Sequence, residues 1–201
     1  MNIFDSDILK MKFSQPDPVS GDLLIAEPLM IDAPFQRSVV AVIENSKNNG
    51  AMGLITNHLS PYILSELVDD ISCDEDIPIF VGGPVHKERL YYLHILGDLL
   101  PDSIEIRNGL YVSGTFNIVK EYINSGEPVN GLIKFFLGYS GWEKGQLRTE
   151  LDNFDWAVSK KMNPKNILEL TGEDMWQSAV ETLDPHKYRL WLNCPRSIIM
   201  N

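Results

Sequence analysis

Residues 37–57, "RSVVAVIENSKNNGAMGLITN", decide the fold class of this 201-residue chain. Residues 37–45 are rich in β-branched side chains and form a run long enough for a central strand. Asn49-Gly50 then favours a hairpin turn, because both central positions of a type I′ turn need positive φ. Residues 51–57 return as a second apolar strand. The stretch therefore predicts an antiparallel β-hairpin.

Strands and helices alternate along the rest of the chain. Apolar runs predict further strands at residues 22–29, 77–83, 89–96, 103–106, 109–114, 132–139 and 155–158. Capping residues and helical spacing of apolar residues predict helices at residues 5–12, 61–71, 116–125, 141–151 and 172–183. Residues 163–170 indicate a turn or a short strand, and residues 188–193 a strand that closes the sheet. Because hairpins dominate the first half, we expect an α+β fold with a mixed, largely antiparallel sheet.

Length and composition predict an N-terminal arm at residues 1–20 and a single domain at residues 21–201. A chain this long buries roughly 70% of the surface that its unfolded form exposes, so its folding needs no disulfide or metal. Cys73 and Cys194 belong to no Cys-x-x-Cys pair, and two reduced thiols fit a cytosolic protein better than one disulfide. The N-terminus lacks a signal-peptide pattern, and no apolar run approaches the ~18 residues of a membrane span. We therefore expect a cytoplasmic protein.

The charge balance restricts the class of partner. The chain carries 28 acidic and 17 basic residues, a formal net charge of −11. Nucleic-acid backbones attract basic surfaces, so direct nucleic-acid binding is disfavoured. The best-patterned helices direct Asp and Glu outward, and none resembles a recognition helix. We therefore expect the partner to be a protein or a small molecule, and we expect no cofactor.

The stretch "GLIKFFLGYSGWEKGQLRTEL", residues 131–151, places Ser140 between an apolar run and a helical pattern. A nucleophile elbow reads Gly-x-Ser-x-Gly, but Trp142 stands where the second glycine belongs. A capping box reads Ser-x-x-Glu, and Ser140 with Glu143 meets that spacing in full. We therefore expect Ser140 to cap a helix and not to act as a nucleophile.

The other candidate residues form no catalytic motif, and where they are not structural they suggest a polar binding cleft. The histidines have no metal-ligand spacing, and His94 lies in an apolar strand, as a hydrogen-bonded core histidine would. Gly82-Gly83 follows a strand and indicates a tight turn with close backbone packing, or backbone amides that approach an anion. Glu88-Arg89 suggests an ion pair or a loop anchor. The Trp142 and Gln146 surface indicates packing before ligand binding.

Four segments together resemble the AlgH/YqgE family of bacterial proteins. They are "FQRSVVAVIENSKNNGAMGLITN" (35–57), "VGGPVHKERLYYLH" (81–94), "GLYVSG" (109–114) and "LGYSGWEKGQLRTEL" (137–151). The resemblance covers about residues 20–183. It implies an α+β fold with a bifurcated sheet that partly closes as a barrel, with surrounding helices. Family members are often labelled transcriptional regulators, and the resemblance implies no catalytic residues.

The chain departs from the family pattern in places. Asn57-His58-Leu59 stands where the family commonly has Asn-Arg-Pro, so an anion bound by that arginine would be lost here or held differently. Lys144 replaces a small residue, and the C-terminal tail from His186 looks specific to this lineage.

The sequence thus predicts a non-enzymatic AlgH/YqgE-like regulator that acts indirectly, through a protein or small-ligand contact. The alternative is an enzyme of unrecognised type with a polar cleft near residues 82–89 and 138–146. The candidate ligand or partner surface comprises Arg37, Gly82, Gly83, Glu88, Arg89, His94, Trp142 and Gln146.

Overall fold

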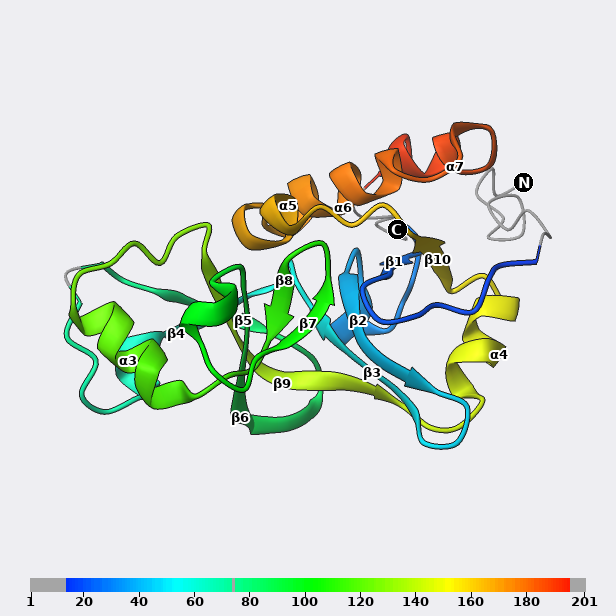
Figure 1. Cartoon of the computed structure of the whole chain (residues 1–201). Helices are drawn as coiled ribbons and strands as arrows, with labels where there is room; N and C mark the ends of the chain where they lie inside the picture. Colours follow the sequence, from blue (N-terminus) through cyan, green and yellow to red (C-terminus); the bar gives the residue numbers. More distant parts are fainter. Residues whose placement is uncertain (1–13, 74, 196–201) are drawn as a thin grey trace.

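The computed structural model describes residues 14–73 and 75–195 and has an α+β fold built on one ten-stranded sheet (Figure 1). The short helix expected at residues 5–12 lies outside the described residues. The strands are β1 (Leu23–Ala26), β2 (Val39–Ser46), β3 (Gly50–Ile55), β4 (Leu59–Ile63), β5 (Pro78–Val81), β6 (Val85–His94), β7 (Ile104–Arg107), β8 (Leu110–Val112), β9 (Ile133–Trp142) and β10 (Trp156–Ser159). The helices are α2 (Leu64–Leu67), α3 (Phe116–Asn124), α4 (Gln146–Asp152), α5 (Pro164–Glu169), α6 (Gly172–Glu181) and α7 (Pro185–Leu192), with single 3-10 turns η1 (Ala33–Phe35) and η2 (Gly97–Leu99).

The sheet is bifurcated, and β9 is the strand at which it divides. The main path runs in the order β10-β1-β2-β3-β9-β6-β8-β7. One edge of β9 pairs with β6, and its other edge is shared: β5 pairs with residues 135–137 in parallel, and β3 pairs with residues 140–142. β4 then pairs with β5 as a side branch. The other strand pairs among the described residues are antiparallel. The mixed, largely antiparallel sheet is therefore confirmed.

The expectation that the sheet partly closes as a barrel is wrong. The strand path ends at β10 and at β7, and these two strands do not pair with each other. Because β5 occupies the edge of β9 that β3 would need in order to continue, the sheet spreads into two arms. A barrel requires the end strands to meet, and two diverging arms carry them apart.

The predicted hairpin is confirmed as β2 and β3, with a different turn. Ser46 pairs with Gly50, so the turn consists of three residues rather than the two of a type I′ turn. Gly50 has φ +88° and takes the left-handed position that follows such a turn. A side chain at Gly50 would also collide with the Trp142 carbonyl oxygen, at 2.1 Å from the added Cβ. The glycine thus serves both the turn and the close approach of β9.

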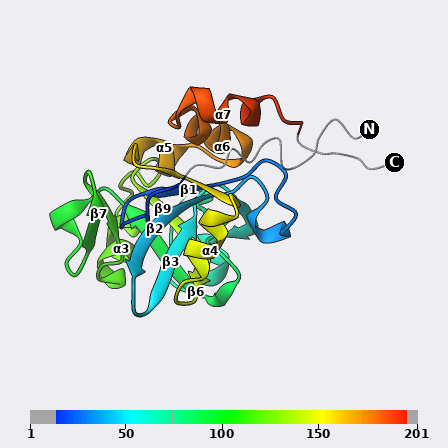
Figure 2. The same cartoon turned by 90° about the vertical axis from the view of Figure 1, so that its right-hand side faces the viewer.

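Both faces of the central strands are buried. Val39 and Ala41 pack in the hydrophobic cluster beneath α5–α7, whereas Val40 and Val42 pack in the cluster beneath α4. A strand covered on both faces reads as a continuous apolar run, which explains the sequence at residues 39–42. A third cluster lies in the other arm, where α3 packs on β5, β6 and β9. Figure 2 shows α5, α6 and α7 together on one face of the sheet.

The helix predicted at residues 61–71 is only partly formed. Leu59–Ile63 forms β4 against β5, and the helix α2 is confined to Leu64–Leu67. The Ser60 hydroxyl accepts the Tyr62 amide at 3.2 Å and caps no helix. β4 is the outer strand of its branch, where Pro61 is tolerated because its missing N–H faces no neighbouring strand.

The expectations for residues 163–170 and 188–193 are also wrong, since both are helical. Asn163 and Asp184 each accept a backbone N–H two residues ahead, and proline follows each cap at the first helical position. Tyr188 and Trp191 are spaced for one helical face, and Trp191 stacks on Trp176 of α6. These capping residues are visible in the sequence, but the prediction followed the short apolar runs instead.

Three other predictions are confirmed. The hairpin at residues 103–114 turns at Asn108 and Gly109, which both have positive φ. The helix α3 begins after Thr115 and ends before Gly126, although the Thr115 hydroxyl donates to Asp102 at 2.8 Å instead of capping. The apolar face expected for the helix at residues 172–183 is buried: Met175, Trp176, Ala179, Val180 and Leu183.

Candidate functional site

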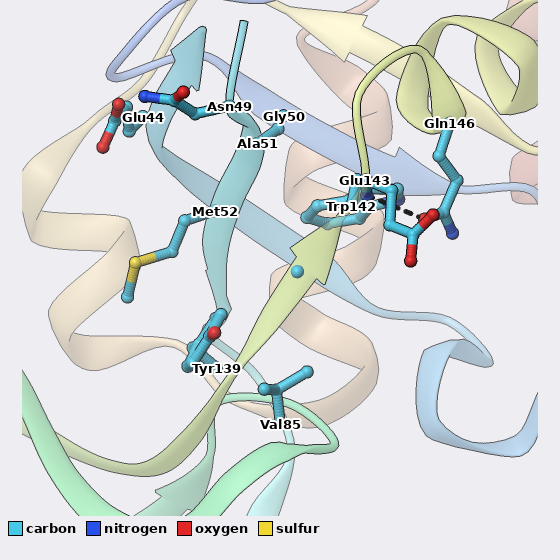
Figure 3. A pocket seen from close by; sticks show the side chains of 11 residues that line it. Glu44, Asn49, Gly50, Ala51, Met52, Val85, Tyr139, Trp142, Glu143 and Gln146 are labelled. Atoms are coloured by element: carbon cyan, nitrogen blue, oxygen red, sulfur yellow. Dashed lines mark hydrogen bonds between the residues drawn. The ribbon is translucent and has the colours of Figure 1, made fainter.

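A groove of about 540 Å³ opens where the β2–β3 hairpin meets the corner between β9 and α4. Figure 3 shows Glu44 and Asn49 on one side of it, and Glu143 and Gln146 on the other. Met52, Tyr139 and Val85 lie along the strands between them. The remaining lining residues are Gly50, Ala51, Gly141 and Trp142. The groove therefore combines an apolar and aromatic floor with two carboxylates and two amides at its sides.

The pairing of β9 brings the two predicted cleft segments together. Val85, from residues 82–89, pairs with Tyr139, and Ala51 of the hairpin pairs with Trp142. Residues 82–89 and 138–146 thus converge on the groove, although Val85 alone represents the first segment in its lining. His86 stacks on Tyr139, with the ring centroids 5.9 Å apart.

Ser140 neither caps a helix nor stands at a strained corner, so its expected capping role is wrong. It lies inside β9, is fully buried, and donates its hydroxyl to the Gly82 carbonyl oxygen at 3.1 Å. That carbonyl also accepts the Ile55 amide at 2.8 Å, and the Gly82 amide donates to Leu137 at 2.8 Å. The Ser140 hydrogen bond therefore joins β9 to the turn after β5 at the place where the sheet divides, beside the groove.

The wall of the groove at α4 is held by a hydrogen-bonded carboxylate. Glu150 accepts the indole N–H of Trp142 at 2.7 Å and that of Trp156 at 2.8 Å. It also accepts the side-chain amide of Gln146 at 2.9 Å, and the Gln146 oxygen accepts the Glu143 backbone N–H at 2.9 Å. Gln146, the first residue of α4, thus links the corner after β9 to Glu150, and no side chain among the described residues caps this helix. The fixed Gln146 amide and the exposed Glu143 carboxylate form a preorganised polar side of the groove.

Arg37, a predicted surface residue, is largely buried away from the groove. Its guanidinium donates to Glu173 at 2.8 Å and to the Cys194 carbonyl at 2.7 Å, and it lies 4.2 Å over the Trp176 ring. Asn57, which the sequence did not single out, lies beside it: its side chain accepts the Val39 amide and donates to the carbonyls of Arg37 and Gly172. These contacts hold α6 and the C-terminal segment onto the sheet.

His94 is fully buried on β6 and makes two hydrogen bonds. Its Nε2 donates to the Ser113 carbonyl at 2.9 Å, and its Nδ1 accepts the Leu96 amide at 3.2 Å, which fixes the neutral tautomer. Burial lowers the pKa of His94, while the Ser113 carbonyl opposes that shift. It is the hydrogen-bonded core histidine that its apolar strand predicts.

Glu88 and Arg89 are exposed on β6 and do not line the groove. Their nearest charged atoms are 3.9 Å apart, and Glu88 also contacts His86 at 3.0 Å. A backbone N–H and the His86 ring lower the pKa of the Glu88 carboxyl. This is a surface ion pair of small energetic weight.

Gly82 and Gly83 serve backbone packing. A Cβ at Gly82 would lie 2.3 Å from the Gly138 carbonyl oxygen, and one at Gly83 would lie 2.3 Å from the Tyr139 carbonyl oxygen. The paired glycines therefore let the backbone of the turn after β5 lie directly against β9. This is the tight turn with close backbone packing that the sequence indicated.

The structure reveals a second cavity, of about 240 Å³, that the sequence did not indicate. Its lining includes Lys134 of β9, a residue that is 3% exposed. The one signal in the sequence was a lysine within the apolar run of residues 132–139. Alternation places every second residue of a strand on the same face, and this face proved to be buried beneath α5.

Three further findings concern the cysteines, metal sites and membrane-spanning helices. Cys73 and Cys194 are both free thiols. Within residues 14–73 and 75–195, no group of three or more His, Cys, Asp or Glu side chains is arranged to hold a metal ion. The described helices include none with the length and apolar character that crossing a membrane requires.

Comparison with known proteins identifies relatives along nearly the whole chain. A UPF0301 protein of Parabacteroides distasonis is 41% identical over 97% of this chain and 98% of its own length, and one of Bacteroides thetaiotaomicron is 43% identical over 98% and 97%. The solution structure of the AlgH protein from Pseudomonas aeruginosa superposes with a TM-score of 0.66, at 30% identity over 86% of this chain and 92% of that one. A crystal structure of a Corynebacterium diphtheriae protein, at 21% identity and a TM-score of 0.67, shares the fold. The family model described as DUF179, AlgH-like, matches residues 23–187, and the chain therefore belongs to the AlgH-like family.

Proposed function

We propose that this protein is a non-enzymatic, cytoplasmic binding protein that takes a basic, partly apolar ligand in the groove between the β2–β3 hairpin and α4. The observation that carries the proposal is the pair of exposed carboxylates, Glu44 and Glu143, on opposite sides of an apolar floor. A segment of a partner protein that alternates lysine or arginine with apolar residues fits that arrangement. Its cations would meet the carboxylates, and its apolar side chains would cover Met52 and Tyr139.

The hydrogen-bonding groups of the groove support a peptide as the ligand. The Asn49 and Gln146 side chains each offer an amide at the rim, and a peptide backbone presents both donors and acceptors to such groups. The Gln146 amide is already oriented by Glu143 and Glu150, so binding loses little side-chain freedom at that point. We propose a regulatory role in transcription that is exercised through such a protein contact and not through DNA.

Titration with a short acetylated peptide that alternates lysine and leucine tests the site. We expect the side-chain amide NMR signals of Asn49 and Gln146 to shift, and the affinity to fall as salt rises. Replacing both carboxylates, Glu44→Gln and Glu143→Gln, should weaken binding by ~2- to 30-fold, since each of the two exposed charge contacts contributes ~0.2–1 kcal/mol.

The matched control is Glu121→Gln, an exposed glutamate of α3 that does not line the groove. It should leave the affinity for the peptide unchanged. A peptide with glutamate in place of lysine should not bind. If the control variant weakens binding as much as the double variant does, general attraction to the acidic surface explains the result and the groove proposal fails.

A further inference from the structure

Lys134 is a nearly fully buried amine on β9. Its Nζ donates to the carbonyl oxygens of Ile167 and Leu170, both at 2.8 Å, where α5 ends. It also lies 4.1 Å from the centroid of the Phe80 ring. None of the carboxylates in the described part of the chain forms an ion pair with it. A buried lysine without a carboxylate loses hydration and gains no opposite charge, so the neutral amine is favoured.

The neutral form of the amine can make both carbonyl contacts. A neutral amine has two N–H donors and one lone pair, whereas an ammonium has three donors and no lone pair. Ile167 and Leu170 use two donors. In the neutral form both N–H donors are therefore occupied, and the nitrogen lone pair is left to act as a nucleophile. Burial lowers the pKa of Lys134 to about 7, so a large fraction of the amine is neutral near physiological pH.

The cavity of about 240 Å³ beside Lys134 is large enough for a small organic molecule. Its walls are largely apolar and share Phe80 with the amine, so a small organic molecule can bury apolar surface beside Nζ. The apolar lining residues are Ile77, Pro78, Phe80, Val129, Ile133 and Leu168.

We propose that Lys134 and this cavity form a binding site for a small neutral aldehyde or ketone, held reversibly as an imine on Lys134 Nζ. The amine lone pair attacks the carbonyl carbon and gives a carbinolamine after proton transfer from nitrogen to oxygen. Loss of water then forms the carbon–nitrogen double bond. The amine and the carbonyl compound therefore yield one imine and one water, with no oxidant or reductant.

The acidic rim of the cavity sets the charge of the ligand. Glu75, Asp76 and Glu169 are exposed and line the cavity. Their charges repel anionic carbonyl compounds, such as keto acids and phosphorylated aldehydes. The site thus favours a neutral carbonyl compound. It is separate from the proposed peptide groove, and either proposal can fail without the other.

Reductive trapping tests the inference on the wild-type protein. The folded chain is incubated with propanal and cyanoborohydride at pH 7, and the alkylated lysines are identified by peptide mass mapping. At that pH fewer than about one in a thousand exposed lysines is neutral, so Lys134 should react at least ~10-fold faster than the exposed Lys144. Measured as a ratio to Lys144, trapping at Lys134 should fall as pH rises from 7 to 10, because the neutral fraction of Lys144 still grows over that range while that of Lys134 is nearly complete.

Two further arms test the geometry. Glyoxylate is a small anionic aldehyde. With it, the ratio of trapping at Lys134 to trapping at Lys144 should be lower than with propanal. Lys134→Arg, which keeps donors for the α5 carbonyls but forms no stable imine, should remove this trapping product and leave the others. Trapping at Lys134 that is no faster than at Lys144, or that follows the same pH profile, overturns the proposal. Because these readouts come from the wild-type chain, the test does not depend on the folding of the variant.

Discussion

Lys134 shows at the scale of a single residue how burial changes chemistry. Its pKa of about 7 in the folded protein lies below the ordinary lysine value of 10.5, because the low-dielectric interior penalises the charged form. Below pH 7 both the folded and the unfolded chain carry the proton, and the folded state holds a buried charge. Between pH 7 and 10.5 the unfolded chain binds a proton that the folded chain does not bind. The associated stability is fully present above 10.5 and is lost as pH falls towards 7.

Lys134→Met therefore gives a pH-dependent change in the free energy of unfolding. Between pH 7 and 9, the wild-type protein should gain about 2–3 kcal/mol relative to this variant, since each pH unit in that window contributes ~1.4 kcal/mol. Urea unfolding at a series of pH values measures the difference.

Lys165→Met is the matched control, because the Lys165 side chain is 73% exposed. The difference between this variant and the wild type should stay constant over the same pH window. If the Lys134→Met curve also runs parallel to that of the wild type, Lys134 titrates as an ordinary lysine in the folded protein.

At the scale of elements, the contact between the β5–β6 turn and β9 positions the groove. Gly82 has no positive φ, so its glycine is required by space and not by backbone conformation. The added Cβ would lie 2.3 Å from the backbone of Gly138 and 3.0 Å from Leu54. A backbone atom cannot move aside without separating β5 from β9, where the sheet divides.

Gly82→Ala should therefore destabilise the protein by several kcal/mol, or prevent folding, through overpacking against the backbone. Gly126→Ala is the control: Gly126 has φ +80° but nothing within 4 Å of an added Cβ, so we expect only about 1–2 kcal/mol from the backbone strain. Thermal unfolding of the two variants compares them. Equal losses of stability would mean that the backbone around Gly82 shifts easily to make room for the added Cβ. The contact between Gly82 and Gly138 would then not be what holds β5 against β9.

The short helices α5 and α7 are elements whose secondary structure the sequence predicted wrongly. Residues 163–170 were expected to form a turn or a short strand, and residues 188–193 a strand, because their apolar runs are too short to establish a period. The caps at Asn163 and Asp184, each followed by proline, were the better signals. Their helical state is completed by packing: Ile167, Tyr188 and Trp191 belong to the same hydrophobic cluster as α6.

At the scale of the whole molecule, charge determines which partners approach. A net charge of −11 repels phosphate backbones over distances set by the ionic strength. A gel-shift experiment with the pure protein at physiological salt should therefore show no sequence-selective DNA complex. Added at increasing concentration, a basic peptide that fills the groove should not create one. Tight, sequence-selective binding by the protein alone would contradict regulation through a protein contact.

The sequence by itself determined the α+β class, the two hairpins at residues 37–57 and 103–114, and the buried face of α6. These features follow from local chemistry: apolar periodicity, and turn positions that need positive φ. The sequence offered a polar cleft near residues 82–89 and 138–146 only as part of the alternative hypothesis, and the pairing of β6 with β9 is what brings these segments together.

Only the tertiary structure decided that the sheet divides at β9 without closing, that Ser140 bonds to Gly82, and that Lys134 is buried beside a cavity. Each depends on atoms far apart in the chain: Ser140 lies 58 residues from Gly82, and Lys134 lies 33 residues from Ile167. A serine or a lysine has the same local signature whether its neighbour is water or a carbonyl oxygen. What surrounds it is set by which strands share the edges of β9, and the chain reaches that arrangement only when it folds as a whole.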